Sequence, residues 1–89
     1  MASESKLQRK IITYLEDDGW EVVRPIILSK AGYEDLFCFK NGITMFIEVK
    51  ADEQEPRPLQ AHRISQHKAN GFKSFFCNSW EMFLDELNK

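Results

Sequence analysis

An Asn-Gly dipeptide at positions 41–42 constrains the fold of this chain more than any other feature. It separates two apolar runs, residues 33–40 and 43–50. A two-residue type I′ turn needs positive φ at both central positions, which asparagine and glycine tolerate better than other residues. We therefore predict an antiparallel hairpin in which Leu36 faces Ile47 and the other pairs follow in the same register.

The open end of this hairpin gathers the charged residues of interest. The register places Asp35 opposite Glu48, with Lys50 two residues further along the same face. Opposed carboxylates repel each other, which favours a bound cation between them, and Mg²⁺ or Mn²⁺ prefers such oxygen ligands. The alternative is a solvated pair at the rim, with Lys50 in a surface ion pair worth under about 1 kcal/mol. Phe46 on the same face favours the first interpretation, because it indicates the end of a buried surface.

The rest of the chain predicts a mixed α/β fold. Apolar residues recur at helical spacing from Leu7 to Leu15, between a candidate cap at Ser3 and a terminating Gly19. The remaining patterns predict further elements along the chain: a strand at 20–28 near a sheet edge or with an irregular end, a loop at 52–58, a helix at 59–69, a strand at 72–77, and a helix after Asn78 or Ser79. The expected order is α-β-β-β-α-β-α, with a parallel neighbour for the last strand.

Composition sets the class of protein. A chain of 89 residues with 43% hydrophobic residues fits a single small domain, residues 1–89, with a packed core. Cys38 and Cys77 lie in apolar segments without metal-binding spacing, which favours buried free thiols. No apolar run is long enough to span a membrane, and no leader is apparent, so we expect a soluble protein inside the cell. The formal net charge of −2 argues against a nucleic-acid partner only until bound divalent cations are counted.

Several short motifs together resemble a known nuclease superfamily. Residues 32–36, the hairpin, the Ile47–Lys50 segment, Leu59-Gln60 and Gly71 are similar to the PD-(D/E)XK nucleases. Within that superfamily they resemble the short VRR-Nuc (virus-type replication-repair nuclease) domains, over nearly the whole chain. The resemblance implies a restriction-endonuclease-like core, a mixed sheet flanked by helices. One departure is Glu34, which replaces the family's proline; we expect its side chain to point to the opposite face from Asp35 and not to bind metal.

The resemblance also implies roles for individual residues. Asp35, Glu48 and the backbone carbonyl of Val49 would bind Mg²⁺ or Mn²⁺, Lys50 would polarise the attacking water, and Gln60 would complete the active site. Glu4 would be a further metal ligand, although a carboxylate at a helix start also interacts favourably with the helix dipole. His67 is expected to be a packed, hydrogen-bonded histidine at the core edge, and His62 to lie on the surface.

The implied reaction is hydrolysis of a DNA phosphodiester by a homodimer that resolves four-way (Holliday) junctions, without a small-molecule cofactor or a membrane partner. A flap or restriction-like nuclease is the alternative enzyme, and a non-catalytic DNA-binding module is the alternative of another class. The family suggests a phage or prophage source, and hence the cytoplasm of a bacterial or phage-infected cell. Seven basic residues are candidate phosphate contacts, the two nearest Gln60 being favoured: Arg57, Arg63, Lys6, Arg9, Lys10, Lys68 and Lys73.

Overall fold

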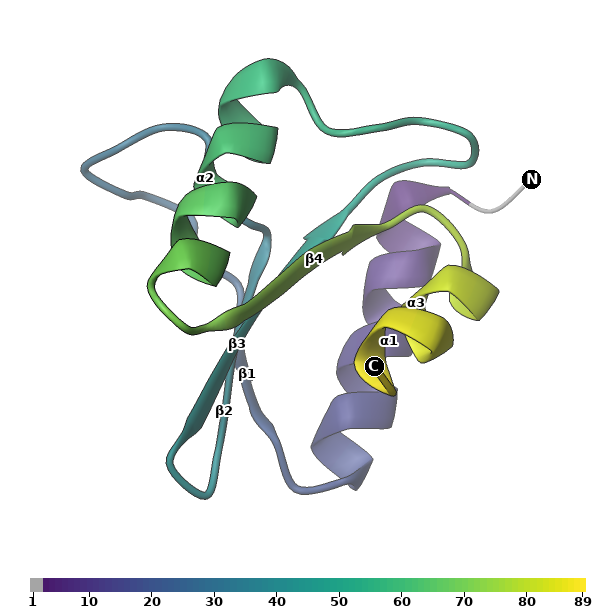
Figure 1. The fold of residues 1–89 in the computed structure, drawn as a ribbon. Helices are drawn as coiled ribbons and strands as arrows, with labels where there is room; N and C mark the ends of the chain where they lie inside the picture. Colours follow the sequence, from purple (N-terminus) through teal and green to yellow (C-terminus); the bar gives the residue numbers. More distant parts are fainter. Residues whose placement is uncertain (1–2) are drawn as a thin grey trace.

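The computed structural model describes residues 3–89, and Figure 1 shows how the elements are arranged. Their order along the chain is the expected α-β-β-β-α-β-α. The bounds are α1 Glu4–Asp17, β1 Glu21–Val23, β2 Leu36–Lys40, β3 Ile43–Val49, α2 Pro58–Ala69, β4 Lys73–Cys77 and α3 Trp80–Leu87.

The four strands form one mixed sheet in the order β1-β2-β3-β4. The β2–β3 hairpin has the predicted register, from Leu36 opposite Ile47 to Lys40 opposite Ile43. Asn41 and Gly42 both have positive φ, 49° and 79°, as a type I′ turn requires. Strand β4 runs parallel to β3 after α2, which confirms the predicted parallel neighbour.

The ends of the two amphipathic helices follow local capping chemistry. The Ser3 hydroxyl accepts a hydrogen bond from the backbone N–H of Lys6 at 3.1 Å, and Gly19 ends the α1 segment at φ +90°. Ser79 caps α3 in the same way, by accepting from the backbone N–H of Met82. These caps confirm the predicted start and end of α1 and the start of α3.

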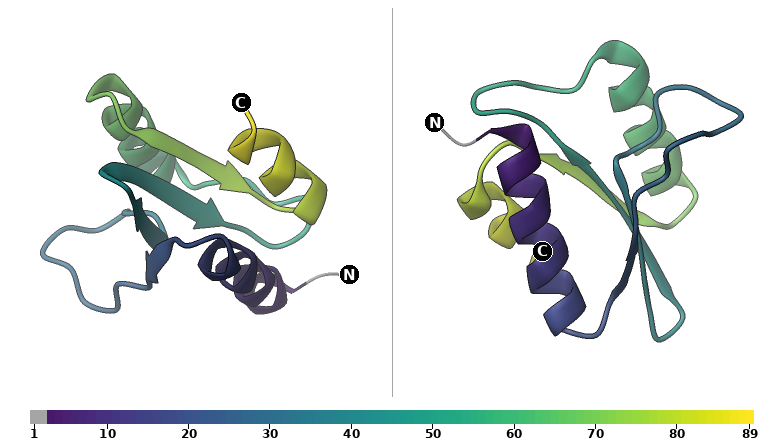
Figure 2. Two further views of the ribbon diagram at one scale, coloured as in Figure 1. Left: turned by 90° about the horizontal axis from the view of Figure 1, so that it is seen from below. Right: turned by 180° about the vertical axis from the view of Figure 1, so that it is seen from behind.

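The hydrophobic core lies between the sheet and the pair α1 and α3, while α2 covers the other face of the sheet beside β4 (Figures 1 and 2). Ile11, Leu15 and Phe83 are fully buried there. Cys38 and Cys77 are buried free thiols, as predicted, and burial raises the pKa of each to about 12. Both cysteines therefore act as small apolar side chains at neutral pH.

The first strand is much shorter than the sequence pattern predicted. Only Glu21–Val23 pairs with β2, and the apolar residues after Pro25 lie in a loop that runs from residue 24 to residue 35. Proline has no N–H to donate to a neighbouring strand, so pairing ends before it. The edge position expected for this strand is confirmed, because β1 has a single neighbour in the sheet.

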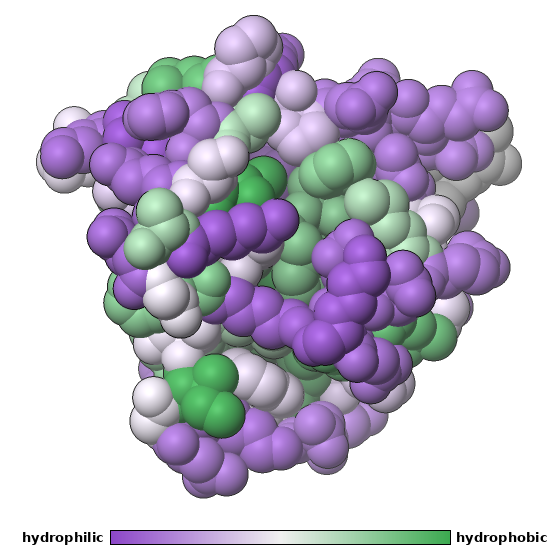
Figure 3. All heavy atoms as spheres, in the orientation of Figure 1, coloured by the Kyte–Doolittle hydropathy of each residue, from purple (hydrophilic) through white to green (hydrophobic). Residues whose placement is uncertain are grey.

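The molecular surface is largely polar. Figure 3 shows that hydrophilic side chains dominate the face seen in Figure 1, with hydrophobic side chains gathered in a hollow near its centre. Within the described part of the chain, no helix is long and apolar enough to cross a membrane.

Candidate functional site

Asp35 stands just before strand β2, at the open end of the hairpin. The sequence predicted that Asp35 pairs with Glu48 across the hairpin. The regular pairing stops at Leu36 and Ile47, so these two residues do not form a pair in the sheet. Instead, the Oδ2 atom of Asp35 accepts a hydrogen bond from the backbone N–H of Val49 at 2.9 Å. The side chain thus takes the place of a backbone carbonyl and stays beside the strand that carries Glu48.

Glu48 is almost completely buried near the end of β3, with 1% of its surface exposed. Its Oε1 atom is buried and has no hydrogen-bond partner in the part of the chain that is described. Burial, followed by the negative charge of Asp35, raises the pKa of Glu48 to about 8. Burial also raises the pKa of Asp35, against the opposing effect of its hydrogen bond to Val49. A buried polar atom without a partner is costly, so this carboxylate is poised to accept a proton or a cation.

Lys50 and Gln60 meet beside these carboxylates. The Nζ atom of Lys50 lies 3.9 Å from Oε2 of Glu48 and donates to Oε1 of Gln60 at 3.3 Å. The same Gln60 oxygen accepts from the backbone N–H of Arg57 at 2.8 Å, which ties the first turn of α2 to the end of β3. Gln60, which the resemblance groups with these residues, therefore contacts the end of β3.

Glu4 is exposed in the first turn of α1. Its negative charge still reaches the site, because it contributes to the raised pKa of Glu48. Across residues 3–89, no three His, Cys, Asp or Glu side chains lie close enough together to form a ready cation site. The predicted set of Glu4, Asp35 and Glu48 is therefore not assembled, whereas Asp35 and Glu48 lie close enough for each charge to act on the other.

Glu34 does not point to the face predicted from its sequence position. Its Oε2 atom lies 2.7 Å from Nδ1 of His67 in α2 and accepts from the Ser74 hydroxyl in β4 at 2.5 Å. Ser74 pairs with Phe46, so Glu34 is on the α2 side of the sheet, the side of Glu48. The alternation of sides fails here because residues 33–35 precede the regular strand.

His67 is the packed histidine that the sequence predicted. Its ring stacks on Phe46 with centroids 4.1 Å apart, and 8% of its surface is exposed. Nothing in the sequence indicated its partner, since Glu34 is 33 positions away along the chain. His62 is exposed on the same helix, as expected. The buried group of Glu34, His67 and Ser74 forms a polar layer between α2 and the sheet, next to Asp35.

The residues predicted to contact phosphate differ in whether their side chains are exposed or bonded within the protein. Five have exposed side chains: Lys6, Arg9, Lys10, Arg57 and Lys68. Arg63 is engaged within the protein, because Nε donates to the carbonyl of Ala31 at 3.0 Å and the guanidinium lies over the Tyr33 ring. Lys73 is half-buried and donates to the carbonyl of Lys89.

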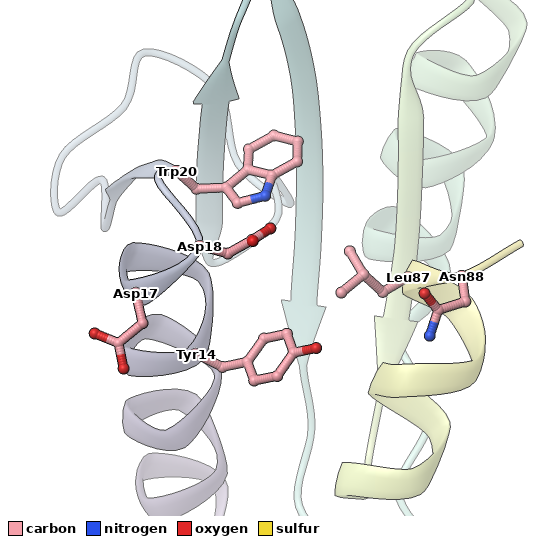
Figure 4. Close-up of a pocket in the computed structure, with 6 residues that line it drawn as sticks. All are labelled: Tyr14, Asp17, Asp18, Trp20, Leu87 and Asn88. Carbon is pink, nitrogen blue, oxygen red and sulfur yellow. The ribbon is translucent and has the colours of Figure 1, made fainter.

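A pocket of about 440 Å³ lies elsewhere, between the C-terminal ends of α1 and α3 (Figure 4). Its lining residues are Tyr14, Asp17, Asp18, Trp20, Leu87 and Asn88. It includes none of the predicted site residues. The candidate site at the end of the hairpin is therefore separate from this pocket.

Comparisons with known proteins agree with this arrangement. The family model described as archaeal Holliday junction resolvase (hjc) matches residues 2–78. A solved structure described as a VRR_NUC domain superposes with a TM-score of 0.85 at 20% sequence identity. That superposition covers 99% of this chain and 97% of the other. No curated protein matches the chain in sequence.

Proposed function

The chain belongs to the archaeal Holliday junction resolvase family, and from that premise we propose that it is a metal-dependent endonuclease that cuts four-way DNA junctions. The observation that carries the proposal is the state of Glu48. Its carboxylate is buried beside Asp35 with one oxygen unpartnered, which costs stability in the absence of a cation. A non-catalytic DNA-binding module has no use for that cost. The nuclease fold of the VRR_NUC relative supports the same conclusion.

The donor set fits a hard divalent cation. We propose that Asp35, Glu48 and the backbone carbonyl of Val49 bind Mg²⁺ or Mn²⁺, without Glu4, whose carboxylate is not gathered with the other two. When bound, such an ion neutralises phosphate charge and lowers the pKa of water. The hydrogen bond from Val49 fixes one oxygen of Asp35, so the carboxylate is oriented before any ligand arrives.

Lys50 supplies the positive charge of the site. Its ammonium group is held between Gln60 and Glu48, with 11% of the side chain exposed, so its position is defined and little water screens it. We propose that Lys50 stabilises the charge that develops on the phosphate and orients the attacking water. Gln60 is the positioning residue that keeps the ammonium group there.

A four-way junction has two strands to cut, and one small site can cut one. We propose that the protein acts as a symmetric homodimer, which would present two sites and double the basic surface. The exposed cations of α1, Lys6, Arg9 and Lys10, and Arg57 before α2 would then follow the DNA backbone. Light scattering on the purified chain tests the dimer directly: a mass near twice 10.5 kDa supports it, and a monomer contradicts it.

The substrate is tested with labelled DNA of defined shape. The protein is incubated with Mg²⁺ or Mn²⁺ and an immobile four-way junction, a flap or a linear duplex of the same sequence. Paired symmetric nicks in the junction, absent with EDTA, are expected. Equal cleavage of linear duplex would contradict junction selectivity, and preferential flap cleavage would favour the alternative enzyme.

The role of Lys50 is tested with a matched pair of lysines. Lys50→Ala should reduce cleavage at least about 100-fold while junction binding persists, as expected for loss of a charge aimed at the transition state. Lys40→Ala is the control, because Lys40 lies at the other end of the hairpin and pairs with Asp18. Unimpaired cleavage by Lys50→Ala would place the active site elsewhere.

A further inference from the structure

The loop between β1 and β2 carries the most exposed apolar side chains of the described residues. Ile26 and Ile27 are 92% and 90% exposed, and Leu28 next to them is 44% exposed. Figure 2 shows the loop standing out from the body of the fold in both views. The fold does not bury these adjacent isoleucines, which indicates a surface that a binding partner covers.

The base of this loop is held firmly against α2. Arg63 donates from Nε to the carbonyl of Ala31 at 3.0 Å, and its guanidinium lies 5.0 Å from the centre of the Tyr33 ring. Gly32, at φ +82°, is packed so closely that a Cβ there would lie 2.5 Å from Cγ of Leu59. The isoleucine tip is thus presented from an anchored base and not from a frayed segment.

The charged residues around the tip of the loop are all positive. Arg24 and Lys30 flank the tip, both are exposed, and no acidic residue occurs from position 24 to position 33. The loop then leads directly into Asp35. The charge of Arg24 acts on the Asp35 carboxyl group, lowering its pKa against the larger effect of burial. The apolar tip therefore lies between two cations, in the loop that ends at Asp35.

We propose that Ile26 and Ile27 form a wedge that inserts between unstacked bases at the branch point of the DNA, while Arg24 and Lys30 contact the flanking phosphates. This inference rests on the proposed function. Apolar side chains placed between base steps are a known way to hold distorted DNA. A branch point offers base faces that a continuous duplex hides, so the wedge gives a physical reason for selecting junctions over linear DNA.

The charges favour DNA over other partners for this tip. A two-fold contact between copies through this loop would bring the cations of both tips, Arg24 and Lys30, into one interface without an acidic residue of either tip to balance them. A lipid surface would also accept an apolar tip with basic flanks, but it would leave the carboxylates at the end of the loop without a role. Only DNA uses the tip, its cations and the adjoining site together.

The test measures binding and cleavage with one set of variants. The double variant Ile26→Ser, Ile27→Ser is compared with wild type and with the control Ile43→Ser. Ile43 is 57% exposed and lies next to the turn of the hairpin, at the opposite end from Asp35. The double variant Ile26→Leu, Ile27→Leu keeps the tip apolar. Binding is measured in Ca²⁺ with a four-way junction carrying 2-aminopurine at the branch point and with a linear duplex, and urea unfolding checks that each variant is folded.

The serine double variant should bind the junction roughly tenfold more weakly, with duplex binding unchanged, because it removes apolar surface that would be buried against the bases. It should also lose the rise in 2-aminopurine fluorescence that wild type, the leucine variant and Ile43→Ser produce. Wild-type binding and fluorescence in the folded serine variant would overturn the wedge. The wedge would also be overturned if the serine variant were a monomer where wild type is a dimer. It would be overturned too if wild type sedimented with anionic phosphatidylglycerol vesicles and the serine variant did not.

The outcomes separate the wedge from the proposed function. If wild type cuts and selects junctions but the serine variant does so equally well, the wedge fails and the proposed function stands. If wild type neither binds nor cuts any branched DNA, the proposed function fails, and the wedge fails with it.

Discussion

The carboxylate of Asp35 accepts a hydrogen bond from the backbone N–H of Val49 at 2.9 Å, and so stands next to the residue that follows Glu48 in β3. This bond fixes the Asp35 carboxylate at the end of the hairpin that also holds the buried carboxyl group of Glu48. Ionising both groups is unfavourable in the free protein and becomes favourable when a cation is bound.

The stability of the metal-free protein should depend on the protonation of Glu48. The pKa of Glu48 is raised in the folded protein from 4.5 to about 8. The fold therefore retains a proton that the unfolded chain releases, and the stability from this proton is complete below about pH 4.5 and lost as the pH rises to about 8. Glu48→Gln should remove this loss, making the variant more stable than wild type at pH 8 by on the order of a few kcal/mol.

The measurement is urea unfolding of both proteins in EDTA from pH 5 to pH 9. The difference between wild type and Glu48→Gln should grow with pH and level off near pH 8. Mn²⁺ or Mg²⁺ added at pH 8 should stabilise wild type and leave the variant almost unchanged. A difference that does not vary with pH would show that the Glu48 carboxylate is not destabilised by burial.

The polar layer under α2 should matter for stability, and two histidines of the same helix provide the comparison. His67→Ala would leave the buried Glu34 carboxyl with Ser74 as its remaining hydrogen-bond partner among the described residues. Removing one partner of such a buried pair costs about 3 kcal/mol. His62→Ala, at an exposed position, should change the free energy of unfolding by less than about 0.5 kcal/mol. Equal effects of the two substitutions would contradict the buried network.

Gln60→Ala should lower the cleavage rate more than it lowers stability. The amide oxygen of Gln60 accepts from both Lys50 and the backbone N–H of Arg57. Its loss should reduce stability by about 1 kcal/mol, as for other helix caps, and leave the Lys50 ammonium group free to move. We expect a decrease of about tenfold or more in kcat with little change in junction affinity. Gln54→Ala is the control, because that side chain is exposed before α2; a decrease confined to affinity would contradict the positioning role.

The hairpin and its register were predictable because they depend on local chemistry. The Asn41-Gly42 turn fixes which residues face each other, and all five pairs from Leu36–Ile47 to Lys40–Ile43 have the predicted register. The caps at Ser3 and Ser79 are local in the same sense, since each side chain bonds three residues ahead. Patterns of this range can be read from a sequence without knowing the rest of the fold.

The loop after β1 was not predictable from the same kind of pattern. The β-branched residues Ile26 and Ile27 resemble a strand in composition, but composition reports a preference for a pleated surface and not the presence of a partner. Strand β2 pairs with β1 at Phe37–Phe39 and has no partner for the residues beyond Pro25. The sequence pattern therefore predicted a strand where the structure has an exposed loop.

The predicted face for the Glu34 side chain was wrong, because its partners are distant along the chain. Its partners His67 and Ser74 lie 33 and 40 positions away, in elements whose placement depends on the whole sheet. Alternation along a strand holds only where the strand is regular, and residues 33–35 precede β2. The contact between Lys50 and Gln60 was not predicted either, because it joins the end of a strand to the start of the next helix.

The central claim is that Asp35 and its neighbours form the catalytic site of a junction-cutting nuclease. The most direct test is the cut map of an immobile four-way junction, with wild type, Asp35→Asn and the exposed control Asp52→Asn side by side in Mg²⁺ or Mn²⁺. Wild type and Asp52→Asn should give paired nicks at symmetric positions, whereas Asp35→Asn should bind the junction and leave it intact. Nicks of wild-type intensity from Asp35→Asn would contradict the account.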